Sequence, residues 1–154
     1  MHLAGCTSGP TGAWVTQRAR QIAWTLQEQP PRFRFPIRDR DGKFTRDFDV
    51  VFAAEGIEVV KTPVRAPKAN AIAERFVRTV RAKCLDWLLI VNLRHLERVL
   101  QVFADHYNTH RPHRSLEQQP PLVETDPVSA HDHEWRVRRR DRLGGLLHEY
   151  KLAA

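Results

Sequence analysis

Cysteine is scarce in this chain, with only two among its 154 residues. Cys6 and Cys84 form no CxxC pair, so the sequence supports neither a disulfide framework nor a zinc site built on thiolates. Two histidine pairs also lack the further ligands and spacing of a zinc module, namely His110 with His113 and His131 with His133. So few cysteines are compatible with a reducing cytoplasm, where we expect the protein.

Long apolar runs are missing as well. No stretch approaches the ~18 consecutive apolar residues that a membrane-spanning helix needs. The chain does not begin with a basic segment followed by an apolar run, which is the pattern of an export signal. We therefore expect neither membrane insertion nor export.

Acidic residues are outnumbered by basic ones, 18 Asp and Glu against 25 Lys and Arg, which gives a net charge of +7 and a pI near 10.1. This imbalance favours a polyanionic partner such as nucleic acid, although a solvated basic surface would show the same composition. With 42% hydrophobic and 28% charged residues the chain should fold, and its length allows one ordinary core.

Apolar periodicity predicts alternating helices and strands. Helices are expected over residues 11–28, between Thr45 and Gly56, and over residues 68–90 and 93–106, because apolar side chains recur there at helical spacing. Strands are expected over residues 2–7, 33–38 and 57–61. In the second strand Phe33, Phe35 and Ile37 should form the buried face. The alternation predicts an α/β or α+β fold, a sheet layered with helices.

Beyond Tyr107 the sequence becomes rich in turn residues and basic residues. We therefore expect the core to occupy residues 1–122 and a linker with a basic tail to occupy 123–154. In the tail Gly144-Gly145 is a two-residue turn signal for a hairpin that would pair Asp141 with His148. An unstructured arginine-rich segment is the alternative. The tail holds the densest positive run in the chain, a set that either binds DNA phosphates or stays solvated: Arg136, Arg138, Arg139, Arg140 and Arg142.

Two carboxylates occupy positions suited to metal-dependent phosphodiester chemistry. Asp39 directly follows the predicted strand 33–38, and Glu74 lies near the start of the predicted helix 68–90. Mg²⁺ prefers a few carboxylate oxygens, with water and nucleic acid completing its octahedron, and two such ions can activate the attacking oxygen and stabilise the leaving one. The simpler interpretation is that Asp39 is a turn residue and that Glu74 is solvated and paired with Arg78.

Three segments resemble a known family, the integrase-type catalytic core of DDE transposases, which occurs in bacterial insertion sequences and retroviral integrases. The segment 37–44, Ile-Arg-Asp-Arg-Asp-Gly-Lys-Phe, is similar to the motif of the second acid, and 67–76, Pro-Lys-Ala-Asn-Ala-Ile-Ala-Glu-Arg-Phe, is similar to that of the third. The segment 107–116, Tyr-Asn-Thr-His-Arg-Pro-His-Arg-Ser-Leu, resembles the one that closes this core. The likeness spans roughly residues 2–122.

The resemblance implies a ribonuclease-H-like mixed sheet flanked by helices, and a site in which Asp39 and Glu74 hold Mg²⁺ or Mn²⁺. Asn70 would orient the turn before Glu74 or Glu74 itself. Asp41 is a second candidate for the Asp39 position, because the glycine of the motif is displaced to Gly42. Residues near Glu74 are candidates for contacts with DNA phosphates, namely Arg65, Lys68, Arg75 and Arg78, and so are Arg138, Arg139 and Arg140 in the tail.

The family's first catalytic aspartate lies on an early strand, yet residues 1–38 contain no aspartate and a single acid, Glu28. We therefore expect a core that is incomplete at its N-terminus. The implied reaction is polynucleotidyl transfer, the DNA cleavage and strand transfer of transposition or integration, with this chain inactive by itself. The alternative is a non-catalytic remnant that binds DNA, or that associates with itself or with a full-length transposase.

Overall fold

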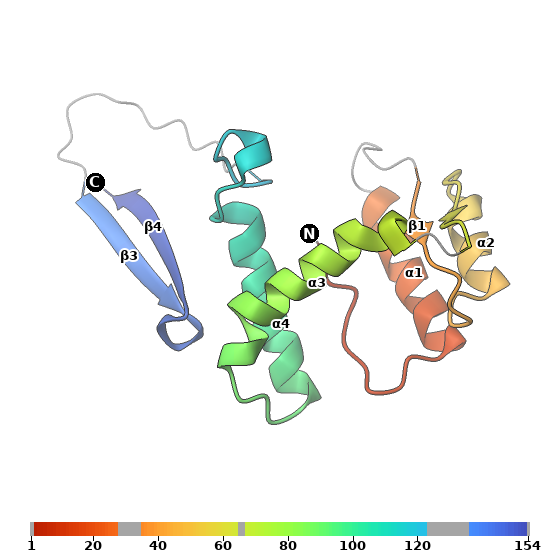
Figure 1. The fold of residues 1–154 in the computed structure, drawn as a ribbon, viewed down its shortest axis with the longest axis horizontal. Helices are drawn as coiled ribbons and strands as arrows, with labels where there is room; N and C mark the ends of the chain where they lie inside the picture. Colours follow the sequence, from red (N-terminus) through yellow and green to blue (C-terminus); the bar gives the residue numbers. More distant parts are fainter. Residues whose placement is uncertain (1, 28–34, 65–66, 123–135, 154) are drawn as a thin grey trace. The chain divides into compact units, whose positions relative to one another are not determined.

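The computed structural model describes residues 2–27, 35–64, 67–122 and 136–153 (Figure 1). The chain divides into two compact units, residues 4–79 and residues 80–154 with the first three residues. Each unit combines helices with a two-stranded sheet. The predicted α+β class is therefore confirmed at the level of mixed helices and small sheets. Among the described residues, none of the helices is long and apolar enough to span a membrane.

The core of the first unit forms where α1 (Gly12–Gln27) packs on α2 (Arg46–Ala54). Ala19 of α1 is buried against Phe48 and Phe52 of α2, and partly buried apolar side chains surround these three. The rings of Phe44, Phe48 and Phe52 meet edge to face at centroid distances of 5.0 and 5.1 Å, a favourable arrangement for aromatic quadrupoles. Both helices occupy their predicted positions.

β1 (Ile37–Arg38), which precedes α2, and β2 (Val60–Lys61), which follows it, form a short parallel pair. The amide of Val60 donates to Pro36 O, and that of Thr62 donates to Arg38 O, both at 2.9 Å. Because α2 lies between the paired strands in sequence, β1, α2 and β2 form one crossover unit of the kind that parallel strands require.

The predicted buried face of the second strand is wrong. Phe33 lies outside the described residues, while Phe35 and Ile37 are 49% and 65% exposed. Arg38 is the buried residue of β1, at 8% exposure. Its guanidinium binds Asp49 of α2 through two hydrogen bonds of 2.9 and 2.8 Å, and this satisfied charge occupies the side of the strand that faces the helix.

Two further boundaries differ from expectation. Residues 2–7 form no strand, and Gly5 interrupts the extended backbone there with a φ of +127°. The helix expected over 68–90 is divided into a 3-10 turn (Pro67–Asn70), α3 (Ala71–Lys83) and a second 3-10 turn (Leu85–Trp87). The backbone of Cys84, at φ −141° and ψ −67°, breaks the helix. Ile72, expected on the apolar face, is 85% exposed.

The second unit contains α4 (Leu93–Thr109), whose first turn is capped by the Asn92 side chain, an acceptor for the amide of His95 at 2.8 Å. Val99, Phe103 and Ala104 of α4 are buried, in agreement with the predicted helix. A 3-10 turn (Arg114–Leu116) follows the helix.

An antiparallel hairpin, β3 (Arg136–Arg142) and β4 (Leu147–Ala153), completes the second unit. Asp141 lies opposite His148, which is the pairing that the glycine turn predicts. The connection is longer than two residues, however, because Leu143, Gly144 and Gly145 form a 3-10 turn with positive φ at all three.

Candidate functional site

Asp39 lies directly after β1, as the sequence predicts, and its side chain is partly buried. Its Oδ1 accepts a hydrogen bond from the amide of Asp41 at 3.1 Å, which closes a short turn after the strand. The backbone carbonyl of Asp39 accepts a hydrogen bond from Arg38 Nη1 at 3.0 Å. Asp39 thus leaves the strand in a backbone conformation that a buried arginine supports.

Asp41, the competing candidate, is committed to its own turn. Its Oδ1 accepts from the amide of Lys43 at 2.9 Å, and its Oδ2 forms an ion pair of 3.0 Å with Lys43 Nζ. The backbone and side-chain hydrogen bonds from Lys43 lower the pKa of the Asp41 carboxyl below its usual value. In the described part of the chain Asp39 has no such cation on its carboxylate.

Glu74 occupies the first turn of α3 and is exposed. Among the described residues it forms no ion pair, so the pairing with Arg78 that would explain Glu74 as a surface residue is not formed. Asn70 ends the 3-10 turn that leads into α3, in the place expected of a residue that orients this turn. Arg65 and the Lys68 side chain lie outside the described residues, while Arg75 and Arg78 are exposed on α3.

Asp39 and Glu74 both belong to the unit of residues 4–79. The structure joins them by no hydrogen bond, and across the described ranges no group of three His, Cys, Asp or Glu residues could hold a metal ion. The carboxylates of the described residues therefore do not complete a magnesium site. His131 and His133 lie outside the described residues.

Sequence analysis missed the ion-pair cluster beside Asp39. Asp49 of α2 binds Arg38 at 2.8 Å and Lys61 of β2 at 3.1 Å, so one carboxylate links β1, α2 and β2. The Arg38 side chain also lies over the Phe44 ring, 5.5 Å from its centroid. Hydrogen bonds from Arg38 lower the pKa of Asp49. The only signal in the sequence was an arginine in an alternating strand followed by an acid on the next helix, and it does not show that the arginine is buried.

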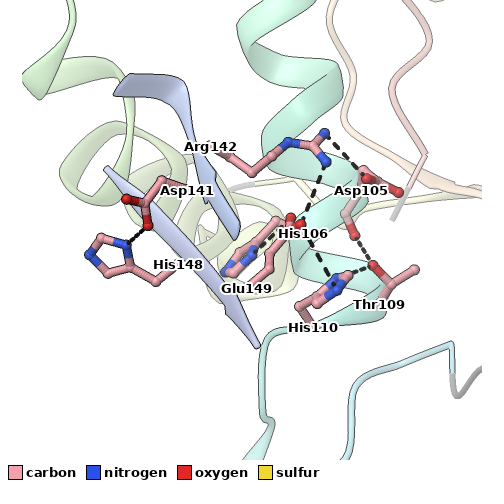
Figure 2. A network of polar contacts seen from close by, with 8 residues as sticks. All are labelled: Asp105, His106, Thr109, His110, Asp141, Arg142, His148 and Glu149. Carbon is pink, nitrogen blue, oxygen red and sulfur yellow. Dashed lines mark hydrogen bonds and ion pairs between the residues drawn. The ribbon is translucent and has the colours of Figure 1, made fainter. Parts of the chain in front are cut away.

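A second polar network lies where the hairpin meets α4 (Figure 2). Glu149 of β4, only 2% exposed, points toward His106 and His110 of α4 at 3.6 and 3.9 Å, and Arg142 of β3 contacts it at 3.5 Å. Arg142 also reaches Asp105 of α4, at 3.5 Å. These contacts hold one end of the hairpin against the helix.

The histidines of this network differ in their hydrogen bonds. The Thr109 hydroxyl donates to Asp105 O at 2.8 Å, so its oxygen accepts from His110 Nδ1 at 2.6 Å. His106 Nδ1 and Glu149 Oε1 are buried and have no hydrogen-bond partner in the structure. Burial lowers the pKa of His106, and the Glu149 charge opposes this shift only in part.

Residues 55–121 match the family model described as "Integrase core domain". This match contains Glu74 and Asn70, and it ends before the hairpin; Asp39 and Asp41 precede it. No curated protein and no solved structure matches the chain. Over residues 55–121 the chain is thus similar to the integrase core domain family, in agreement with the resemblance of its motifs.

Proposed function

We propose that this chain supplies two catalytic acids, Asp39 and Glu74, to a polynucleotidyl transferase of DNA transposition or integration. The family match carries the proposal, because an integrase core domain implies this reaction class and because the matched segment includes the turn and helix that present Glu74.

A ribonuclease-H-like sheet is the fold we propose for the complete core. The crossover of β1, α2 and β2 supports it, since Asp39 follows the carboxyl end of a parallel strand. Functional groups of parallel sheets gather at that edge. The two-stranded pair would then be part of a larger sheet.

The chain by itself does not cut or join DNA in this proposal. Divalent ions would supply charge stabilisation to the attacking and leaving oxygens. Asp39 and Glu74 are two ligands of a set that the described residues do not complete, and Glu28, the one acid before Asp39, lies outside those residues.

DNA is the partner that the charge supports. The exposed Arg75 and Arg78 of α3 lie one and four residues after Glu74, and contacts from such residues to phosphates give affinity without base specificity. We expect micromolar or weaker binding to duplex DNA that weakens as salt is raised.

The alternative is a remnant that binds DNA, or associates with a complete transposase, without chemistry of its own. It is favoured because the residues that the structure describes group no third ligand with Asp39 and Glu74. Adding the chain to a complete enzyme of the family would separate the cases, because a remnant that associates should lower the activity of the complete enzyme in proportion to its concentration.

The function is tested by strand cleavage and strand transfer on labelled duplex DNA with Mg²⁺ or Mn²⁺. The chain alone should give no product, because misplacing a reacting group by ~1 Å already costs ~100-fold in rate. Product that disappears in Glu74→Gln but persists in Asp41→Asn would contradict the proposed inactivity. Product that both variants retain would contradict the role of Glu74.

A further inference from the structure

The hairpin carries its arginines in an alternating pattern that the linear sequence conceals. Successive side chains of a strand point to opposite faces. Arg136, Arg138 and Arg140 of β3 therefore share one face, while Val137 and Arg139 belong to the other. The charge of β3 is divided between two surfaces with different surroundings.

The face of Arg139 is locally neutralised. Arg139 binds Asp141 through two hydrogen bonds of 2.7 and 2.9 Å, and His148 contacts the same carboxylate at 2.7 Å. The exposed Tyr150 and Leu152 of β4 lie on this face as well, because β4 places them opposite Arg139 and Val137. This surface is mixed in character and offers little free positive charge.

The opposite face is basic and available. Arg136, Arg138 and Arg140 are exposed, and within the part of the chain that the structure describes none of them forms an ion pair with a carboxylate. Lys151 lies opposite Arg138, and the buried Glu149 lies opposite Arg140. We call Arg136, Arg138 and Arg140 the arginine face.

The inner end of the same face is fixed to the protein. Arg142 and Glu149 contact Asp105, His106 and His110 of α4 (Figure 2). Since Arg142 continues the i, i+2 series of the arginine face, its attachment sets the rotation of the strand about its own axis. The anchored end thus orients the exposed arginines.

We propose that the arginine face binds the phosphate backbone of duplex DNA. Same-face residues of a strand are ~6.7 Å apart, so the three guanidinium groups form a row of positive charge along which backbone phosphates can lie. The aromatic Tyr150 lies on the other face. The arginine face therefore lacks the stacking platform that single-stranded nucleic acid prefers.

This inference deepens the proposed function, because it names a surface that would hold DNA outside the segment that matches the integrase core domain. It is nevertheless tested independently of the acids. Loss of DNA binding in variants of the hairpin would leave the role of Asp39 and Glu74 intact, because that role is tested by strand cleavage and strand transfer.

The experiment measures the affinity of the full chain for a fluorescent duplex of arbitrary sequence by anisotropy, over a series of salt concentrations. Arg138→Ala and Arg140→Ala should each weaken binding several-fold, and each should lower the slope of log affinity against log salt by ~0.9. Arg139→Ala is the matched control, because it removes the same charge from the same strand. It should change both quantities little.

Equal losses in all three variants would overturn the arginine face in favour of a net-charge effect, and unchanged affinity in Arg138→Ala and Arg140→Ala would overturn it outright. Tighter binding to single-stranded DNA than to the duplex would also contradict the proposal. Circular dichroism checks that each variant is folded, and all three side chains are exposed, so we expect unchanged melting.

Discussion

At the scale of single residues, the surroundings of Asp39 separate two kinds of carboxylate. Asp49 balances the buried guanidinium of Arg38, while Asp39 accepts one backbone hydrogen bond in its own turn. Asp49 is thus structural, and Asp39 is free for another role. The sequence placed Asp39 at a strand end correctly. It could not show which side of β1 is buried, because a paired arginine can occupy an interior position as well as an isoleucine does.

The first prediction compares these two carboxylates. Asp39→Asn should leave the free energy of unfolding within ~0.5 kcal/mol of the original, because asparagine can still accept the Asp41 amide. Removing the Asp39 charge would also relieve its repulsion with the Glu74 carboxylate, which would stabilise the folded variant. Asp49→Asn should lose roughly 3 kcal/mol, because Arg38 would stay buried without its counter-charge. Urea unfolding of both variants checks this, and a large loss in Asp39→Asn would mark Asp39 as structural.

At the scale of elements, periodicity predicted α1, α2 and α4 because each buries a continuous apolar stripe. The expected helix over 68–90 failed for a physical reason. Its apolar positions are spaced correctly, but Ile72 is exposed, and the helix ends before Cys84, which is fully buried. Spacing alone does not report whether a partner covers the stripe.

The end of α2 provides the second prediction. Gly56 has a φ of +69°, and its amide donates to Ala53 O at 3.0 Å. A side chain at this position would meet no other atom, so Gly56→Ala should lose about 1 kcal/mol through backbone strain alone. Gly42→Ala is the control, because Gly42 is equally open but does not have this positive φ. Thermal melting of the pair should show a loss only at Gly56.

The contacts of Glu149 and Arg142 with α4, which hold the hairpin against that helix, give the third prediction. The folded protein keeps the pKa of His106 below its usual 6.5 because the ring is buried. Unfolding therefore takes up a proton when the pH falls below about 6.5, so stability is present above that value and is lost on acidification. Charged groups around the ring, which include Glu149, His110, Arg111 and Arg142, modulate the loss.

Hydrogen exchange measures this effect. Protection factors of β3 and β4 amides should fall as the pH is lowered from neutral through the range below 6.5. In His106→Gln, which cannot be protonated, the dependence should be much weaker. Protection that rises on acidification would show that the ion pair with Glu149 outweighs burial.

At the scale of the whole molecule, the sequence predicted the likeness to the integrase core domain better than it predicted the architecture. Motifs of a few residues carried this likeness, and the match over residues 55–121 supports it. The division into units at residues 79 and 80 lies within α3 and carries no turn or linker signal in the sequence. The hairpin register followed from two glycines, but the division of its arginines between two faces needed the structure.

The central claim is that Asp39 and Glu74 are ligands of one site, although they are 35 positions apart in the sequence. Paramagnetic broadening by Mn²⁺, followed by NMR on the labelled chain, tests it most directly. Amides around Asp39 and around Glu74 should broaden together in one titration. Glu74→Gln should then weaken the broadening at Asp39, and Asp39→Asn should weaken it at Glu74, while Asp41→Asn changes neither. Independent broadening of the two segments, or none at Glu74, would contradict the account.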